Sequence, residues 1–217
     1  PLNRAAVNTV ANSPFTSSEP VSELAAGEQL FEEMELGGTV NFIAFRQAVA
    51  GYNRIKEKSK PILTLIDFSK PSTEKRFFVF DMEKKKLLYS SVVAHGRNSG
   101  ENYATSFSNQ YGSYKSSLGF YLTENTYQGG NGYSLILNGL EKGINDKAKA
   151  RSIVVHGAPY ANPSVAASGR LGRSLGCPAL PTKLARPIIN TIKDGSVMFI
   201  YANNPHYLAQ SNILHKN

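Results

Sequence analysis

The sequence lacks several features that define large classes of protein. It has a single cysteine and no tryptophan in 217 residues, and one cysteine excludes an internal disulfide. No stretch approaches the roughly 18 uninterrupted apolar residues that a membrane-spanning helix needs. Zinc-ligand spacings, helix-turn-helix signatures and RNP-like aromatic strands are also missing. These absences argue against a disulfide-bonded scaffold, a transmembrane segment and a nucleic-acid partner.

The remaining composition fits a soluble and mostly ordered protein. A length of 217 residues with 41% apolar side chains is enough for one domain with its own core. The chain begins with Pro1 rather than Met, so we expect a mature or trimmed protein whose signal peptide lies outside this sequence. The formal charge is +8, from 24 Lys and Arg against 16 Asp and Glu. Much of it falls in short runs, which are typical of a solvated surface or of a face that attracts an anionic polymer.

Apolar periodicity divides the chain into four parts. Residues 1–20 are rich in Asn, Ser, Thr and Pro without an apolar period, which predicts a flexible leader. Apolar residues then recur at helical spacing in two segments separated by a Gly-Gly pair, which predicts a helical pair over 21–60. Residues 61–205 carry the pattern of strands and form the main domain. Residues 206–217 are predicted to be a polar tail.

Short runs of β-branched and aromatic residues, bounded by Gly, Ser, Asn, Pro or Lys, dominate the main domain. They predict strands at 62–68, 76–82, 87–94, 119–123, 133–137, 153–156 and 197–201. Apolar residues at three- and four-residue steps predict one helix over 183–193. The fold is therefore expected to be mainly β, and α+β overall.

Two long loops rich in Gly and Ser separate the strands: the first long loop (95–119) and the second long loop (157–177). Both are too long for tight hairpin turns, and compact domains retain such loops mostly where they bind or cap something. Glycine allows the backbone to approach a ligand closely. Such loops are suited to holding an anion or an oxyanion through backbone N–H groups.

The second long loop joins two residues that are capable of covalent chemistry. His156 ends a predicted strand, and Cys177 lies 21 positions later in a Gly-Cys-Pro turn. A free thiol has a pKa of about 8.5 and needs a neighbouring base to form thiolate at neutral pH, and imidazole is such a base. No Asp or Glu lies nearby in the sequence, so the Gly157 carbonyl is the candidate for orienting the ring. The N–H groups of Gly176 and Cys177 are candidate donors to a developing oxyanion.

Each of these residues also has an ordinary structural explanation. Taken alone, Cys177 is typical of a buried small thiol, and His156 of a hydrogen-bonded histidine at a strand end. Their combination with two glycine-rich loops favours a nucleophile and its base. A metal site is disfavoured, because the four histidines are far apart and no His-x-x-x-His or Cys pair is present.

The His-Gly pair at 156–157, followed by the Ser-Leu-Gly-Cys element that ends at Cys177, resembles the catalytic stretch of the L,D-transpeptidase (YkuD-type) domain. The segment SSLGF at 116–120 is similar to the family's approach to its next strand. GRSLGCPAL, HGRNSG and FSNQYGSYKSSLG resemble the murein L,D-transpeptidase subgroup, here with GCPAL in place of the usual GCxR. The resemblance implies a β-sandwich or barrel-like catalytic domain over 61–205, with an N-terminal helix pair and one helix after the catalytic loop.

The resemblance also implies a function. The enzyme would act on peptidoglycan in the periplasm or at the cell surface, without a metal or organic cofactor. Cys177 would attack a tetrapeptide stem at its L-centre residue, expel the terminal D-amino acid and form a thioester, which an amine or water would then accept. His156 would act as base and then as acid. The implied partners are peptidoglycan stem peptides, a carbapenem is expected to form an adduct at Cys177, and a monomer is expected.

Two positions depart from the family pattern. Leu175 stands where better-known members carry His, and Ala179 stands where they carry Arg. Because a guanidinium can hold a carboxylate through two parallel hydrogen bonds, nearby arginines are candidate replacements. His95 is a candidate replacement for the missing histidine, and each of these residues also occurs as an ordinary loop residue. The residues expected to bind substrate are Arg173, Ser174, Arg170, His95, Ser117, Asn109 and Tyr103.

Other interpretations fit the same residues. An L,D-carboxypeptidase would use the same site with water as the acceptor. Another cysteine transpeptidase or protease is less suitable, because sortases and caspases space the pair more widely, and in papain-like enzymes the cysteine comes first. A non-catalytic module that binds peptidoglycan stems without turnover is a different class, and the altered Leu175 and Ala179 are its best argument.

Overall fold

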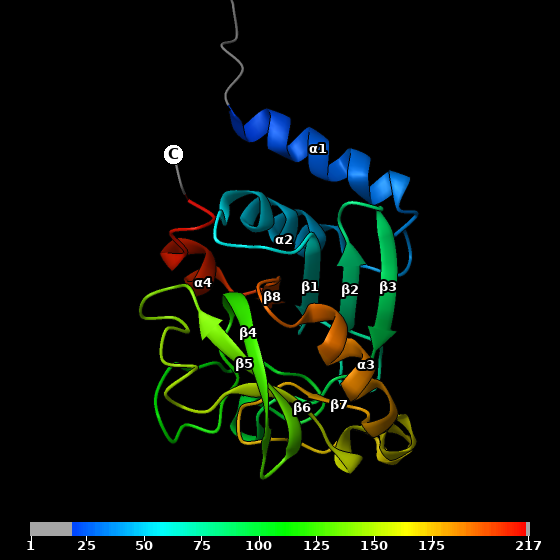
Figure 1. The fold of residues 1–217 in the computed structure, drawn as a ribbon, viewed down its shortest axis with the longest axis vertical. Coiled ribbons are helices and arrows are strands. Elements are labelled where there is room, and N and C mark those ends of the chain that lie inside the picture. Colours follow the sequence, from blue (N-terminus) through cyan, green and yellow to red (C-terminus); the bar gives the residue numbers. More distant parts are fainter. Residues whose placement is uncertain (1–18, 216–217) are drawn as a thin grey trace, which may run out of the picture.

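The computed structural model describes residues 19–215 of the chain (Figure 1). Its helices are α1 (Glu19–Glu33), α2 (Phe42–Arg54), α3 (Thr182–Ile192) and α4 (Pro205–Gln210). Its strands are β1 (Ile62–Asp67), β2 (Phe77–Asp81), β3 (Lys86–Ser91), β4 (Gly119–Gly129), β5 (Gly132–Gly139), β6 (Val154–Gly157), β7 (Ala179–Leu180) and β8 (Val197–Tyr201). The predicted leader, 1–20, lies outside the described residues except for its last two, which begin α1.

The strands form one sheet that almost closes on itself. Their order is β3-β2-β1-β8-β4-β5-β6-β7, with β1–β8 and β6–β7 parallel and the other pairs antiparallel. Beyond β3, Ala94 forms a bridge to Ala179 of β7, and Gly96 forms a bridge to Ser174. The two edges of the sheet therefore meet, which confirms the mainly β, barrel-like prediction and brings the first long loop against the second.

All seven predicted strands are present. The turn that joins β2 and β3 is stabilised by residues within the turn itself. Its turn contains no glycine, but Lys85 adopts a φ of +55°. The Asp81 carboxylate accepts the N–H groups of Glu83 and Lys84 at 3.1 and 2.9 Å. An aspartate that bonds backbone N–H groups ahead of it stabilises a turn of this kind. The two-residue strand β7 was not predicted.

The predicted helical pair covers one side of the sheet. The Asn41 side chain caps α2 by accepting the N–H groups of Ile43 and Ala44. α2 packs against β1 and β8, and α1 lies beside α2 (Figure 1). Gly51 allows the closest approach, because a Cβ at this position would lie 2.0 Å from the Phe120 ring. α3 packs on β6, β1 and β5.

The segment predicted to be a polar tail, 206–217, is described up to His215 and is anchored to the domain by two buried residues, Tyr207 and Ser211, while most of its other described residues are exposed. Residues Pro205–Gln210 form α4, and the buried Tyr207 hydroxyl donates to Glu141 Oε2 at 2.8 Å. The Ser211 hydroxyl donates to the other carboxylate oxygen of Glu141. These hydrogen bonds to the buried Glu141 carboxylate anchor the segment. The polar composition of the segment gives no indication of them. Among the described residues, no helix has the length and apolar character required to cross a membrane.

Candidate active site

Cys177 and His156 lie on neighbouring segments of the sheet. β6 and β7 pair in parallel with His156 opposite Ala179, so Cys177, two positions earlier, runs beside Val154. The Val154 N–H donates to Cys177 Sγ at 3.4 Å, and the thiol donates to the Ser152 carbonyl at 3.5 Å. Among the described residues, no hydrogen bond joins Sγ to the imidazole. The topology thus brings nucleophile and base onto adjacent segments, with the thiol turned toward the backbone.

The His156 ring is held by the next residue in the chain. Its Nδ1 lies 2.9 Å from the Gly157 carbonyl oxygen. Because a carbonyl oxygen only accepts, Nδ1 carries the hydrogen and Nε2 is the unprotonated nitrogen. Burial lowers the pKa of His156, against the opposing effect of the Gly157 hydrogen bond. The ring is therefore neutral at pH 7 with a basic Nε2, and the predicted contact with the Gly157 carbonyl is present.

The Cys177 thiol is almost buried, with 9% of the residue exposed. Burial raises its pKa, while the Val154 N–H and the charge of Arg151 act in the opposite direction. The resting cysteine is therefore a thiol, as its donation to the Ser152 carbonyl requires. It needs a base before it can act as a nucleophile.

Ser174 holds the turn that carries Cys177. Its Oγ accepts the Gly176 N–H at 3.1 Å and donates to the Cys177 carbonyl at 2.6 Å. Gly176 has a φ of +127°, and a Cβ there would lie 2.8 Å from Ile153 Cδ1, so glycine is required. The Ser174 side chain thus bonds the turn, and the Gly176 N–H is donated inside it. The contact of Ser174 with substrate and the oxyanion role of Gly176 stay predictions. The Cys177 N–H donates to no described residue and stays the candidate oxyanion donor.

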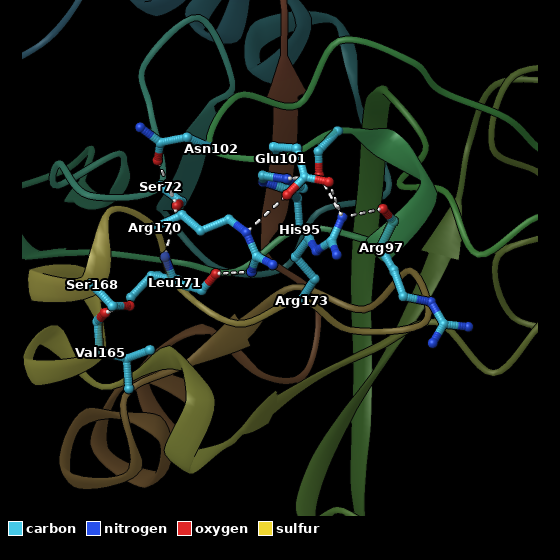
Figure 2. Close-up of polar contacts among 11 residues, drawn as sticks. Ser72, His95, Arg97, Glu101, Asn102, Val165, Ser168, Arg170, Leu171 and Arg173 are labelled. Carbon is cyan, nitrogen blue, oxygen red and sulfur yellow. Dashed lines mark hydrogen bonds and ion pairs between the residues drawn. The ribbon is translucent and has the colours of Figure 1, made fainter.

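The two arginines predicted to hold a substrate carboxylate hold a carboxylate of the protein (Figure 2). Arg170 Nε lies 3.0 Å from Glu101 Oε2, and Arg173 Nη1 lies 3.2 Å from Glu101 Oε1. Arg173 also donates to the carbonyls of Arg97 and Gly100. Both arginines fasten the second long loop to the first. Arg170 Nη1 also donates within its own loop, to the Leu171 carbonyl at 2.8 Å. The contact of both arginines with substrate stays a prediction.

His95 belongs to the core, not to a substrate groove. It is 1% exposed, its Nε2 donates to the Gly100 carbonyl at 3.0 Å, and its Nδ1 accepts from Arg76 Nη2 at 2.8 Å. Phe68 packs edge-on against the ring. Burial first, and then the charge of Arg76, lowers the pKa of His95 to about 4. The prediction that His95 replaces the missing histidine is corrected, because both ring nitrogens are already bonded inside the protein.

The remaining predicted substrate residues divide into two kinds. Ser117 is buried and accepts from Arg151 Nη1 at 2.9 Å, and Asn109 donates to Asp146 Oδ1 at 2.7 Å. Both side chains fasten the first long loop, and their contact with substrate stays a prediction. Tyr103 is 50% exposed and lines a cavity of about 340 Å³, so its contact with substrate stays a prediction.

Sequence reasoning missed two residues near the thiol, Arg151 and Tyr160. Tyr160 packs on Gly172, and burial followed by the charge of Cys177 raises its pKa to about 12. Arg151 precedes β6 and acts electrostatically on the same thiol. Neither residue belongs to a recognisable motif. The one feature of the sequence that could have identified them is that they flank the segment of β6, which contains His156.

The groups around the thiol are suited to anions rather than to a metal ion. In the part of the chain that the structure describes, no three His, Cys, Asp or Glu side chains gather as possible ligands. Cys177 is surrounded instead by a backbone N–H, a backbone carbonyl and a guanidinium. Such donors stabilise a thiolate or a developing oxyanion.

Comparison with known proteins gives a family match. The family model for the L,D-transpeptidase catalytic domain (YkuD_2) matches residues 37–201, and a comparison with curated proteins found no match. Three similar solved structures each have 14% sequence identity to this chain. LdtMt1, an LD transpeptidase in complex with imipenem, matches with a TM-score of 0.40 over 65% of this chain and 59% of that chain. An L,D-transpeptidase from Stackebrandtia nassauensis matches with a TM-score of 0.39 over 84% of this chain and 79% of that chain, and the helical cell shape determining protein Pgp2 from Campylobacter jejuni matches with a TM-score of 0.45 over 73% of this chain and 55% of that chain. The matched part thus spans less than two thirds of the first and third of these chains.

Proposed function

Since the chain belongs to the L,D-transpeptidase catalytic-domain family, we propose that it is a peptidoglycan L,D-transpeptidase that works through a thioester at Cys177. The observation that carries the proposal is the position of this cysteine. It lies on a glycine turn held by Ser174, beside β6, which carries His156 with its Nδ1 fixed by the Gly157 carbonyl. A neutral imidazole with an unprotonated Nε2 is the form that a general base requires.

In the proposed reaction, the Cys177 thiol leaves the Ser152 carbonyl and passes its proton to His156 Nε2. Sγ then bonds to the carbonyl carbon of the L-centre residue of a tetrapeptide stem, and the Cys177 N–H donates to the negatively charged oxygen. The imidazolium gives its proton to the terminal D-amino acid as the C–N bond breaks, which leaves a thioester. An amine of a second stem then attacks the thioester carbonyl carbon, and His156 accepts a proton from that amine. The C–S bond breaks, and the Cys177 thiolate regains a proton from the imidazolium.

The substrate sets the rest of the proposal. Peptidoglycan lies outside the cytoplasmic membrane, so we place the protein in the periplasm or at the cell surface, with stem peptides as its partners and a monomer as the working form. The net charge of +8 suits a polymer that carries carboxylates. Water in place of the second stem would make the same site an L,D-carboxypeptidase.

Incubation with tetrapeptide muropeptides tests this function. Wild-type protein should release the terminal D-amino acid and produce cross-linked dimers or, with water as acceptor, tripeptide stems, as measured by mass spectrometry. Cys177→Ser and His156→Gln should each lower the rate by about a hundredfold or more, whereas His206→Gln, an exposed histidine on α4, should not. A wild-type protein that binds stems without converting them would overturn the enzymatic proposal and support a wall-binding module.

A further inference from the structure

Arg151 connects the first long loop to the start of β6. Its Nη1 donates to the Ser108 carbonyl at 3.0 Å and to Ser117 Oγ at 2.9 Å. Its Nη2 donates to Ser113 Oγ at 3.0 Å and to the Lys115 carbonyl at 2.9 Å. Four acceptors from one short segment fix the plane of the guanidinium, which a lysine could not reproduce.

The charge of Arg151 has no compensating carboxylate. All four of its acceptors are neutral, and none of the ion pairs among the described residues includes it. The arginines that form such pairs are Arg54, Arg170 and Arg173. The Nε of Arg151 is buried and donates to no described atom. A partly buried cation without a counter-ion is costly, and it stabilises any anion that forms next to it.

Two groups beside Arg151 can become anions, the Tyr121 phenol and the Cys177 thiol. Burial raises the pKa of the Tyr121 hydroxyl, which donates to the Ser117 carbonyl, so Cys177 is the group that can ionise nearer to neutral pH. A Cβ built on Gly176, the residue before Cys177, would lie 3.5 Å from Arg151 Nη2. Ser152, the residue after Arg151, has a φ of +58° and accepts the thiol hydrogen of Cys177 on its carbonyl. Strained residues of this kind concentrate at functional sites. The dipeptide 151–152 thus has its side chain beside the cysteine turn and bonds the thiol through a backbone carbonyl.

We propose that Arg151 is a positioning residue of the candidate active site, whose uncompensated charge favours the thiolate of Cys177 while its fork holds the first long loop against the cysteine turn. This inference rests on the proposed role of Cys177 as the nucleophile. Ala179, two positions after Cys177, carries no charge and lies in β7 opposite His156. Arg151 supplies a cation to the same turn from a different place in the chain.

The pH dependence of thiol alkylation tests the proposal without peptidoglycan. Cys177 is the only cysteine, so the rate of reaction with iodoacetamide, followed by intact mass, titrates one thiol. Arg151→Gln should raise the apparent pKa of Cys177 by about one unit, which lowers the alkylation rate at pH 7.5 by about tenfold. Arg151→Lys keeps the charge and should titrate close to wild type even if it lowers the melting temperature.

Arg54→Gln is the matched control, because Arg54 is also half-buried and bonded to a backbone carbonyl, but on α2. It should leave the alkylation profile unchanged. A folded Arg151→Gln protein that titrates like wild type would overturn the proposal. If the Gln variant does not fold, the Lys variant decides, because a thiol pKa about one unit above wild type despite the retained charge would also overturn it. Alkylation of Cys177 does not involve muropeptide, so a protein that fails to convert muropeptides can still show the expected pKa difference between wild type and Arg151→Gln. Failure of the proposed function is thereby distinguished from failure of this proposal.

Discussion

His95 and Arg76 form a buried polar pair that links the stability of the fold to pH. His95 Nδ1 accepts from the guanidinium, so protonation of that nitrogen would break the bond and place two cations side by side. The pKa of His95 is lowered from 6.5 to about 4 by burial and by Arg76. In the unfolded chain the same histidine binds a proton near pH 6.5.

This difference predicts a loss of stability on acidification. Between pH 6.5 and about 4 the unfolded chain holds a proton on His95 that the folded chain does not hold. The stability that the protein gains from neutral His95 is therefore fully present above pH 6.5 and is lost as the pH falls toward 4. The loss amounts to about 3 kcal/mol at pH 4. Urea unfolding at several pH values measures it, with His95→Gln as the reference. If both proteins show the same slope over this range, His95 is not the group responsible.

Ser174 controls the conformation of the cysteine turn through a single hydroxyl. It satisfies the Gly176 N–H and the Cys177 carbonyl together. Ser174→Ala should lower the free energy of unfolding by about 1–3 kcal/mol. It should also slow acylation of Cys177 by tenfold or more, since small displacements of a nucleophile cost about a hundredfold in rate. Ser168→Ala, which removes one exposed hydroxyl from the same loop, should affect neither measurement.

At the scale of elements, the contact between α2 and the sheet depends on one glycine. A Cβ on Gly51 would lie 2.0 Å from the fully buried Phe120 ring, which stacks on Phe199 with centroids 4.2 Å apart and has no free space to enter. Gly51→Ala should therefore destabilise the protein by about 1–3 kcal/mol despite the higher helix propensity of alanine. Thermal unfolding measures this change.

Gly27 in α1 provides the matched helical control. A Cβ there would meet only Arg46, with Cγ at 3.6 Å and Cα at 3.9 Å, which are ordinary contact distances. Gly27→Ala should leave stability unchanged or raise it by up to about 1 kcal/mol. Similar effects of the two substitutions would show that close packing of α2 on Phe120 is not what positions the helical pair.

The junction of the two long loops depends more on backbone contacts than on its ion pairs. Glu101 is the shared carboxylate, but its side chain is 76% exposed. Exposed pairs of this kind contribute at most about 1 kcal/mol. Glu101→Gln should therefore change the free energy of unfolding by less than Arg173→Ala, which also removes bonds to the Arg97 and Gly100 carbonyls. The reverse order in denaturant unfolding would contradict this account of the junction.

At the scale of the whole molecule, local pattern predicted the strands because each is a short apolar run between turn residues. It did not predict β7, since two residues carry no pattern and this strand exists only through its pairing with β6 and with Ala94. Cys177 and His156 were predicted from their chemistry and their positions at a turn and a strand end. The directions of the His95 and Arg173 side chains, and the approach of Arg151 to the thiol, are set by closure of the sheet, which no short segment encodes.

The central claim is that Cys177 is the acylated nucleophile of the folded protein. The most direct measurement is the intact mass after incubation with imipenem, a carbapenem and therefore of the class expected to form an adduct at Cys177. The account predicts one adduct on wild-type protein, mapped to Cys177, and none on Cys177→Ala. A wild-type protein that stays unmodified under conditions that acylate an active L,D-transpeptidase would contradict it.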